Sequence, residues 1–176
     1  WLSPTLGLWF ASLLNRDAQN RQWLNSGRPN TYWMTGFFNP QGFLTAMKQE
    51  VTRMHKKEEW ALDDVVYYSE VTEFDRIEQV RSAPKEGVYV NGLFLDGARW
   101  QKANAKDAEK PEATLAESEP KKLFAQMPVL FVTAMTKALE RGKSPPANKV
   151  YSCPCYKYPA RTDRYLIFMV KLKSRD

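Results

Sequence analysis

Apolar residues near the start of the chain recur at intervals of three and four, the spacing of one face of an α-helix. Ser3 and Pro4 fit the N-cap and the first helical position, and Gly27 is a typical helix stop. We therefore predict a first helix between these residues, with a break near Asn15. Its apolar positions are Leu6, Trp9, Phe10, Leu13 and Leu14.

A second helix is predicted to begin sharply after a short extended piece. Asn39 can cap it, because its side-chain oxygen can accept a bond from an orphan N–H of the first turn, and Pro40 fits the first helical position. Phe38 and Phe43 stand at the two positions of a hydrophobic staple. The helix is predicted to run to about Lys56, with a core-facing stripe of Phe43, Leu44, Met47, Val51 and Met54.

After residue 60 the pattern changes to the alternation of period two that is typical of strands. Because no capped amphipathic helix separates most of these segments, antiparallel pairing is favoured over parallel pairing. The chain is therefore predicted to be α+β, with N-terminal helices followed by an antiparallel sheet. The predicted strands are residues 65–74, 88–95, 127–135, 150–156 and 165–172.

The helical residues 1–60 and the strand-rich residues 61–176 are predicted to be two parts of one domain. Residues 102–122 interrupt the second part; they are polar, rich in Ala, Lys and Glu, and predict a long loop with a short helix near residues 113–118. Residues 141–149 predict a second loop, because Gly and Pro punctuate them.

Composition and charge add two constraints. With 43% hydrophobic and 13% aromatic residues, the 176 residues can form a substantial core. The chain begins with Trp1, and we expect it to be an excised piece of a longer protein. The net charge of +6 is concentrated at one end, since ten basic residues face three acidic ones from Lys137 onward, a balance of +7. Such a segment indicates an acidic protein surface, nucleic acid or a membrane face, or else only solvated strands and loops.

The two cysteines, Cys153 and Cys155, stand two residues apart. On a strand they would share a face and be poorly placed for a disulfide, so a reducing compartment is predicted. No secretory signal is visible, and the longest uncharged apolar run, residues 123–136, is too short for a membrane span. We therefore expect no membrane partner.

The sequence offers little for catalysis or cofactor binding. Gly142, Lys143 and Ser144 look like the end of a phosphate loop, but the glycine required five residues before Gly142 is Lys137. Two cysteines and the single His55 lack metal-site spacing. A Cys–His dyad remains open, although small core cysteines are far more common. We predict no catalytic, cofactor or metal residue.

One alternative function remains open from the residues themselves. Four tyrosines lie close to basic residues in the C-terminal segment, and aromatic rings on a basic barrel can stack nucleic-acid bases. More often, such tyrosines simply pack the faces of a sheet. The tyrosines are Tyr151, Tyr156, Tyr158 and Tyr165.

Five segments together resemble the C-terminal domain of dynein heavy chains. They are residues 36–46 (GFFNPQGFLTA), 87–100 (GVYVNGLFLDGARW), 117–121 (ESEPK), 127–129 (MPV) and 151–157 (YSCPCYK), and they follow the family's order. The residues that carry these motifs, for which the resemblance implies a structural role, are Asn39, Pro40, Phe43, Gly92, Gly97, Arg99, Trp100, Cys153 and Pro154. Lys48, Thr52 and Cys155 depart from the family's usual apolar or aliphatic residues.

The resemblance implies helices followed by a small, incomplete antiparallel β-barrel. It implies a non-catalytic module without cofactors that packs on the AAA+ ring of its own heavy chain. Such a module would tune force, processivity and ATPase coupling of a microtubule motor, touching the microtubule only indirectly and with other dynein subunits as further partners. The style of the sequence is that of ciliary or flagellar dyneins, so a cytoskeletal location in an axoneme is expected, and nucleic acid is the disfavoured partner.

Overall fold

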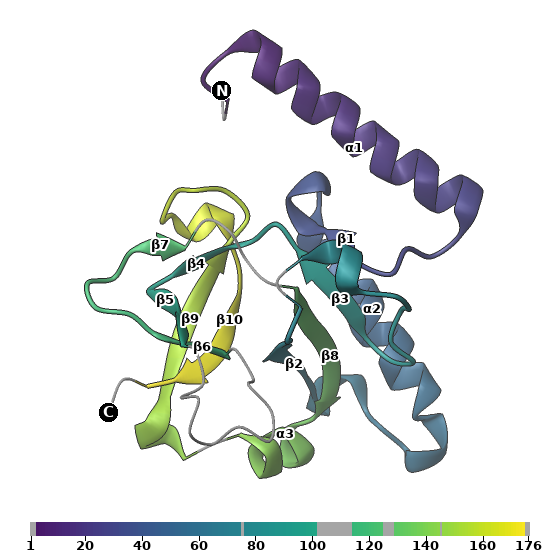
Figure 1. The fold of residues 1–176 in the computed structure, drawn as a ribbon. Coiled ribbons are helices and arrows are strands. Elements are labelled where there is room, and N and C mark those ends of the chain that lie inside the picture. The colour runs from purple at the N-terminus through teal and green to yellow at the C-terminus, as the bar shows by residue number, and fades with distance from the viewer. Residues whose placement is uncertain (1–2, 75, 102–113, 125–128, 145, 175–176) are drawn as a thin grey trace.

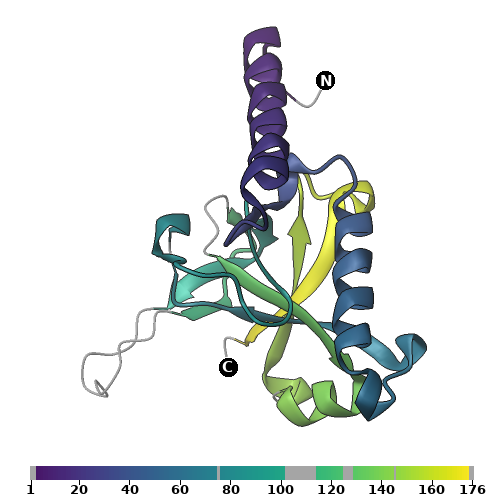
Figure 2. The same cartoon turned by 90° about the vertical axis from the view of Figure 1, so that its right-hand side faces the viewer.

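The computed structural model describes residues 3–74, 76–101, 114–124, 129–144 and 146–174. A long N-terminal helix lies at one end of the molecule, and a second helix packs along a body of strands (Figure 1). A short third helix lies at the opposite end, as the turned view confirms (Figure 2). The helices are α1 (Leu6–Ser26), α2 (Pro40–Met54) and α3 (Lys137–Lys143).

The first helix begins two residues later than predicted. Thr5, not Ser3, is the N-cap, and its hydroxyl accepts the N–H of Leu8 at 3.2 Å. The helix is continuous through Asn15, so the predicted break is wrong. Gly27 ends it as predicted: its φ of 81° is in the left-handed region, and its N–H bonds the carbonyl of Trp23.

The start of α2 is as predicted, but its packing is not. Asn39 is the N-cap and accepts the N–H of Gly42 at 2.9 Å, followed by Pro40. The staple involves a different residue, because Phe37 stacks on Phe43 while Phe38 is 72% exposed. The core stripe also ends earlier than predicted, since Leu44, Met47 and Val51 are buried and Met54 is exposed.

Two sheets form the body. The four-stranded sheet has the order β1 (Tyr32–Trp33), β3 (Val88–Asn91), β8 (Leu130–Thr136) and β2 (Val65–Val71). The six-stranded sheet has the order β5 (Ala98–Gln101), β6 (Thr114–Glu117), β10 (Leu166–Lys173), β9 (Val150–Tyr156), β4 (Phe94–Asp96) and β7 (Leu123–Phe124).

The two sheets curve into a nearly closed, incomplete barrel, which confirms the predicted α+β class. Pairing is antiparallel except for β1 with β3 and β6 with β10, which are parallel. Both exceptions are short, and the second rests on the single match of Lys173 with Ala116. The predominance of antiparallel pairs is therefore as predicted.

The polar interruptions hold more regular structure than their composition indicates. Strand β6 occupies Thr114–Glu117, where a short helix was predicted, because the segment pairs with β5 from Ala98 to Gln101. The predicted loop 141–149 begins inside helix α3. Residues 102–113 of the first predicted loop lie outside the described residues.

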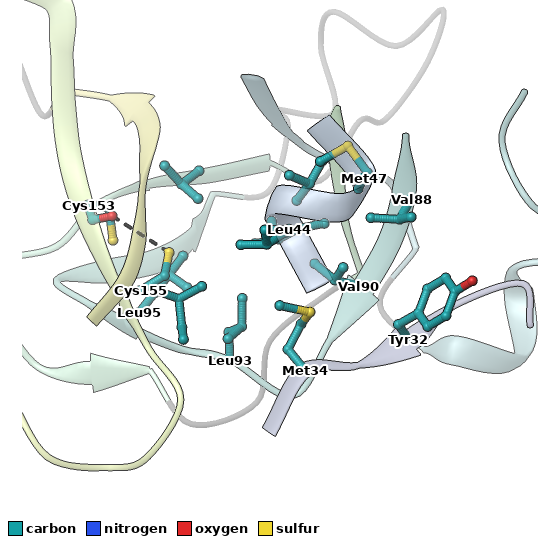
Figure 3. Packing of buried hydrophobic residues seen from close by; sticks show 14 of the residues in the cluster. Tyr32, Met34, Leu44, Met47, Val88, Val90, Leu93, Leu95, Cys153 and Cys155 are labelled. Atoms are coloured by element: carbon teal, nitrogen blue, oxygen red, sulfur yellow. Dashed lines mark hydrogen bonds between the residues drawn. The ribbon is translucent and has the colours of Figure 1, made fainter. Parts of the chain in front are cut away.

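The core lies between α2 and the two sheets. Figure 3 shows Met34, Leu44 and Leu93 between the cysteines of β9 and the valines of β3. All three are essentially inaccessible to solvent, as are Cys153 and Cys155. One continuous apolar cluster therefore joins the helical and strand-rich parts of the chain.

Candidate interaction surface

The C-terminal half of α1 is fastened to the body. The side-chain amide of Gln19 bonds the main chain of Trp33 twice, accepting its N–H at 2.9 Å and donating to its carbonyl at 3.2 Å. The rings of Trp23 and Tyr32 pack edge to face, with their centroids 5.2 Å apart. Arg16 donates to the hydroxyl of Tyr158 at 3.1 Å. These contacts fix the direction in which the rest of the helix points.

The N-terminal half of α1 carries most of the large apolar side chains of this helix that the described fold leaves exposed. No residue of the helix is buried. A row of exposed apolar side chains of this size marks a contact surface rather than a solvated helix. Between 37% and 67% of each side chain is exposed for Leu6, Leu8, Phe10, Leu13 and Leu14.

A groove of about 800 Å³ lies between α1 and the body. Trp9 and Leu13 line it from the helix, and Trp33 and Phe38 line it from the segment between the two long helices. Two cations, Arg16 and Lys157, also line the groove, and its described lining contains no acidic residue. We call the exposed apolar row and this groove together the α1 surface.

The predicted motif residues fall into two groups away from the α1 surface, apart from Gly92. Asn39, Pro40 and Phe43 shape the start of α2. A second group surrounds the turn between β4 and β5, where Gly97 has a φ of 82°. The Nε of Arg99 donates a hydrogen bond of 3.1 Å there to the main-chain carbonyl of Glu117.

The turn at Gly97 joins three of the motif segments. The carbonyl of Asp96 accepts bonds from the Tyr151 hydroxyl at 2.7 Å and the Cys153 thiol at 3.2 Å. A Cβ on Gly97 would lie 2.5 Å from Cδ of Lys121. The three motif segments therefore meet at one tight turn.

The remaining described motif residues are Pro154 and Gly92. The side chain of Trp100 lies outside the described part. Pro154 pairs with Met169 between β9 and β10. Gly92 has a φ of 77°, and a Cβ there would lie 2.3 Å from Cδ1 of Trp33. It thereby allows the loop after β3 to approach the floor of the groove.

A family model for the C-terminal domain of dynein heavy chains matches residues 1–176. The chain belongs to this family. Dynein axonemal heavy chain 8 of Homo sapiens is 50% identical over 99% of this chain and 4% of its own length. Dynein axonemal heavy chain 5 of Mus musculus is 48% identical over 99% of this chain and 3% of its own length. The flagellar outer-arm dynein gamma chain of Chlamydomonas reinhardtii is 44% identical over 100% of this chain and 4% of its own length.

This dynein C-terminal domain thus spans only about 3–4% of the length of these relatives. Their names describe axonemal and flagellar dyneins, in line with the expected ciliary style. Within its described residues, no helix has the length and apolarity to cross a membrane.

The thiols of the dynein domain have the properties of core groups. Burial, together with the nearby carboxylate of Asp96, raises the pKa of Cys153 to about 12. Burial also raises the pKa of Cys155 well above its ordinary value. The imidazole of His55 lies 2.9 Å from Glu86 and stacks on Trp60 at 4.0 Å. The burial of both cysteines disfavours the thiolate that a cysteine nucleophile requires.

The other chemical candidates also have structural explanations. Gly142 and Lys143 lie in the last turn of α3, whereas a phosphate loop must precede a helix N-terminus. Among the tyrosines considered for base stacking, Tyr151 donates its hydroxyl hydrogen to the main-chain carbonyl of Asp96. The ammonium of Lys121 lies over its ring, 3.7 Å from the ring centroid. Tyr158 and Tyr165 pack edge to face at 5.1 Å. The described residues hold no cluster of metal-ligating side chains.

Sequence reasoning missed most of the α1 surface. It identified the apolar positions of the first helix but gave no reason to leave them uncovered. Trp9, Trp33 and Lys157 lie far apart in the sequence, so only the folded protein brings them to one groove. The available signal was the density of large apolar residues at the start of the helix, which fill six of the nine positions from Leu6 to Leu14.

Proposed function

We propose that this domain is a non-catalytic structural and regulatory module that seats on the AAA+ motor ring of a dynein heavy chain. Its α1 surface is the main contact. The observation that carries this proposal is the row of uncovered apolar side chains on a helix whose other half is firmly fastened. The parent protein is an ATP-driven microtubule motor, and its site of action is the axoneme of a cilium or flagellum.

The energetics of the α1 surface suit a stable intramolecular contact. Fully burying a Leu or Phe side chain contributes roughly 1.5–3 kcal/mol. Several such side chains would hold the domain on a neighbouring part of the same polypeptide, where no translational entropy is lost. A seated module biases the conformations of the ring only by the difference in its contact energy between them. Such a bias tunes force, processivity and ATPase coupling without chemistry in the module itself.

The test is a charge placed on the α1 surface of the full-length heavy chain. Phe10→Asp introduces it at a side chain that is 53% exposed, so the domain itself should still fold. We expect a changed microtubule-stimulated ATPase rate and gliding velocity. Leu139→Asp is the matched control, since this side chain is 49% exposed on α3 at the other end of the domain.

Two results would overturn the proposal. The first is a Phe10→Asp motor with the same ATPase rate and velocity as the Leu139→Asp motor. The second is micromolar ATP binding by the 176-residue domain in calorimetry, abolished by Lys143→Ala, because a nucleotide site would make the module more than a structural part.

A further inference from the structure

Among the described residues, strand β2 is the last strand of its sheet and pairs only with β8. The N–H of Thr72, just beyond its end, bonds the carbonyl of Val129 at 3.3 Å. In antiparallel pairs, residues alternate between those that bond the partner and those whose N–H and carbonyl point the other way. Tyr67, Ser69 and Val71 therefore direct their main-chain groups away from β8.

These outward groups face a seam where the barrel does not close. Across it lies β10, which pairs with β6 only at Lys173. The N–H of Ser174 bonds Lys149 on the other side of β10, so by the same alternation Met169 and Lys171 face the seam. A groove of about 320 Å³ runs along the seam, lined by residues of both strands.

The edge of β2 carries few of the features that protect exposed strands. Natural sheet edges are short, or carry Lys, Pro or bulges that discourage pairing with another polypeptide. Strand β2 has seven residues, Val-Val-Tyr-Tyr-Ser-Glu-Val, without Lys or Pro. Its register with β8 is regular from Val65 to Val71. An edge of this kind is suited to receive another strand.

The charges around the seam indicate which strand would fit. Three lysines line the groove against Glu70 and Glu140. Glu140 and Lys171 neutralise each other, because the Lys171 ammonium bonds the Glu140 carboxylate. This leaves Lys143 and Lys173 against Glu70. Lys143 also lines the groove and lies over the ring of Tyr68, 5.4 Å from its centroid. With Lys173 and the neighbouring Arg141 of α3, the surroundings favour an acidic segment.

We propose that the seam between β2 and β10 binds an extended acidic segment of a separate polypeptide, which adds to the edge of β2 as a strand. Main-chain bonds to Tyr67, Ser69 and Val71 supply affinity, and the lysines select acidic side chains. Glu140 and Lys143 of α3 line the groove, and α3 lies at the end of the domain opposite α1 (Figures 1 and 2). Both surfaces can therefore be occupied at once, and this proposal stands apart from ring seating.

The direct test uses the 176-residue domain, which has its own continuous core. Three labelled nine-residue peptides are titrated by fluorescence anisotropy: one alternating Val and Glu, one alternating Val and Lys, and the Val–Glu peptide with an N-methyl group on every residue, so that neither of its edges can donate to a strand. We expect binding by the Val–Glu peptide alone. Hydrogen exchange should then slow at the amides of Tyr67, Ser69 and Val71.

Substitutions in the domain distinguish strand addition from simple charge attraction. Ser69→Pro removes one outward N–H without touching the bonds to β8, and should abolish binding, while Ser69→Ala should retain it. The double variant Lys143→Glu with Lys173→Glu should bind about tenfold more weakly. It serves as the second test if circular dichroism shows that Ser69→Pro does not fold.

Three outcomes would refute strand addition at β2. They are the absence of binding by the Val–Glu peptide, equal binding by the N-methylated peptide, and protection of amides elsewhere than on β2. Equal binding by the Val–Lys peptide would refute the acidic selectivity and with it the chosen partner.

Discussion

The ring of Phe37 stacks on the ring of Phe43, with centroids 4.6 Å apart and planes 19° apart. The adjacent Phe38 instead lies under the guanidinium of Arg16, 5.3 Å from the ring centroid. Two neighbouring phenylalanines therefore serve two purposes. One fixes the entry of the polypeptide into α2, and the other lines the groove of the α1 surface.

This division predicts opposite results for the two residues. Phe37→Ala should lower the free energy of unfolding by about 2 kcal/mol or more, because it removes a ring packed against the core. Phe38→Ala should change it by less than about 0.5 kcal/mol. Urea denaturation followed by fluorescence measures both. If Phe38→Ala is the more destabilising change, the assignment of the two rings is wrong.

Glycine at position 92 is required for a steric reason. Gly92→Ala should cost about 2–4 kcal/mol, since the backbone has a positive φ and the new Cβ would meet the Trp33 ring. Gly142→Ala is the matched control: nothing lies within 4 Å of a Cβ there, and α3 should gain up to about 1 kcal/mol. Thermal unfolding of both variants decides the matter, and a neutral Gly92→Ala contradicts the described loop.

The two thiols should be unreactive in the native protein. A disulfide reagent at pH 8 should label Cys153 and Cys155 only after denaturation, because burial raises the pKa of both. The folded pKa of Cys153, about 12, exceeds its ordinary value of 9.0, so folding favours the protonated thiol. Its stabilising effect is complete below pH 9 and is lost as the pH rises toward 12. Rapid labelling of the folded protein would revive a cysteine-dependent enzyme.

Acid should weaken the contact between α3 and β10. Hydrogen bonds from Lys171 and Ser144 lower the pKa of the Glu140 carboxyl, so the folded state favours its ionised form. This stabilisation is present above the ordinary carboxyl pKa and is lost as the pH falls through the lower folded value. Glu140→Gln should reduce the fall in melting temperature on acidification, whereas Glu78→Gln, at an exposed position, should leave it as in the unsubstituted domain. Identical acid profiles for Glu140→Gln and the unsubstituted domain would contradict the prediction.

Local signals predicted the elements that depend on a few adjacent residues. Asn39 and Pro40 begin α2, and Gly27 ends α1, because capping and the left-handed conformation involve only the nearest turn of the helix. Strand alternation predicted β2, β9 and β10 to within a few residues. The helix expected at residues 113–118 is a strand, because pairing with β5 outweighs local propensity.

The family, the helix start at Asn39 and the antiparallel character of the sheet all follow from the order of the amino acids alone. Which apolar residues stay uncovered does not, because burial depends on partners distant in the sequence. The assembled fold decides that Phe37 rather than Phe38 packs on Phe43, that α1 retains an exposed apolar row, and that β2 is left as an open edge. Periodicity shows that a face is apolar, but only the tertiary contacts show whether anything covers it.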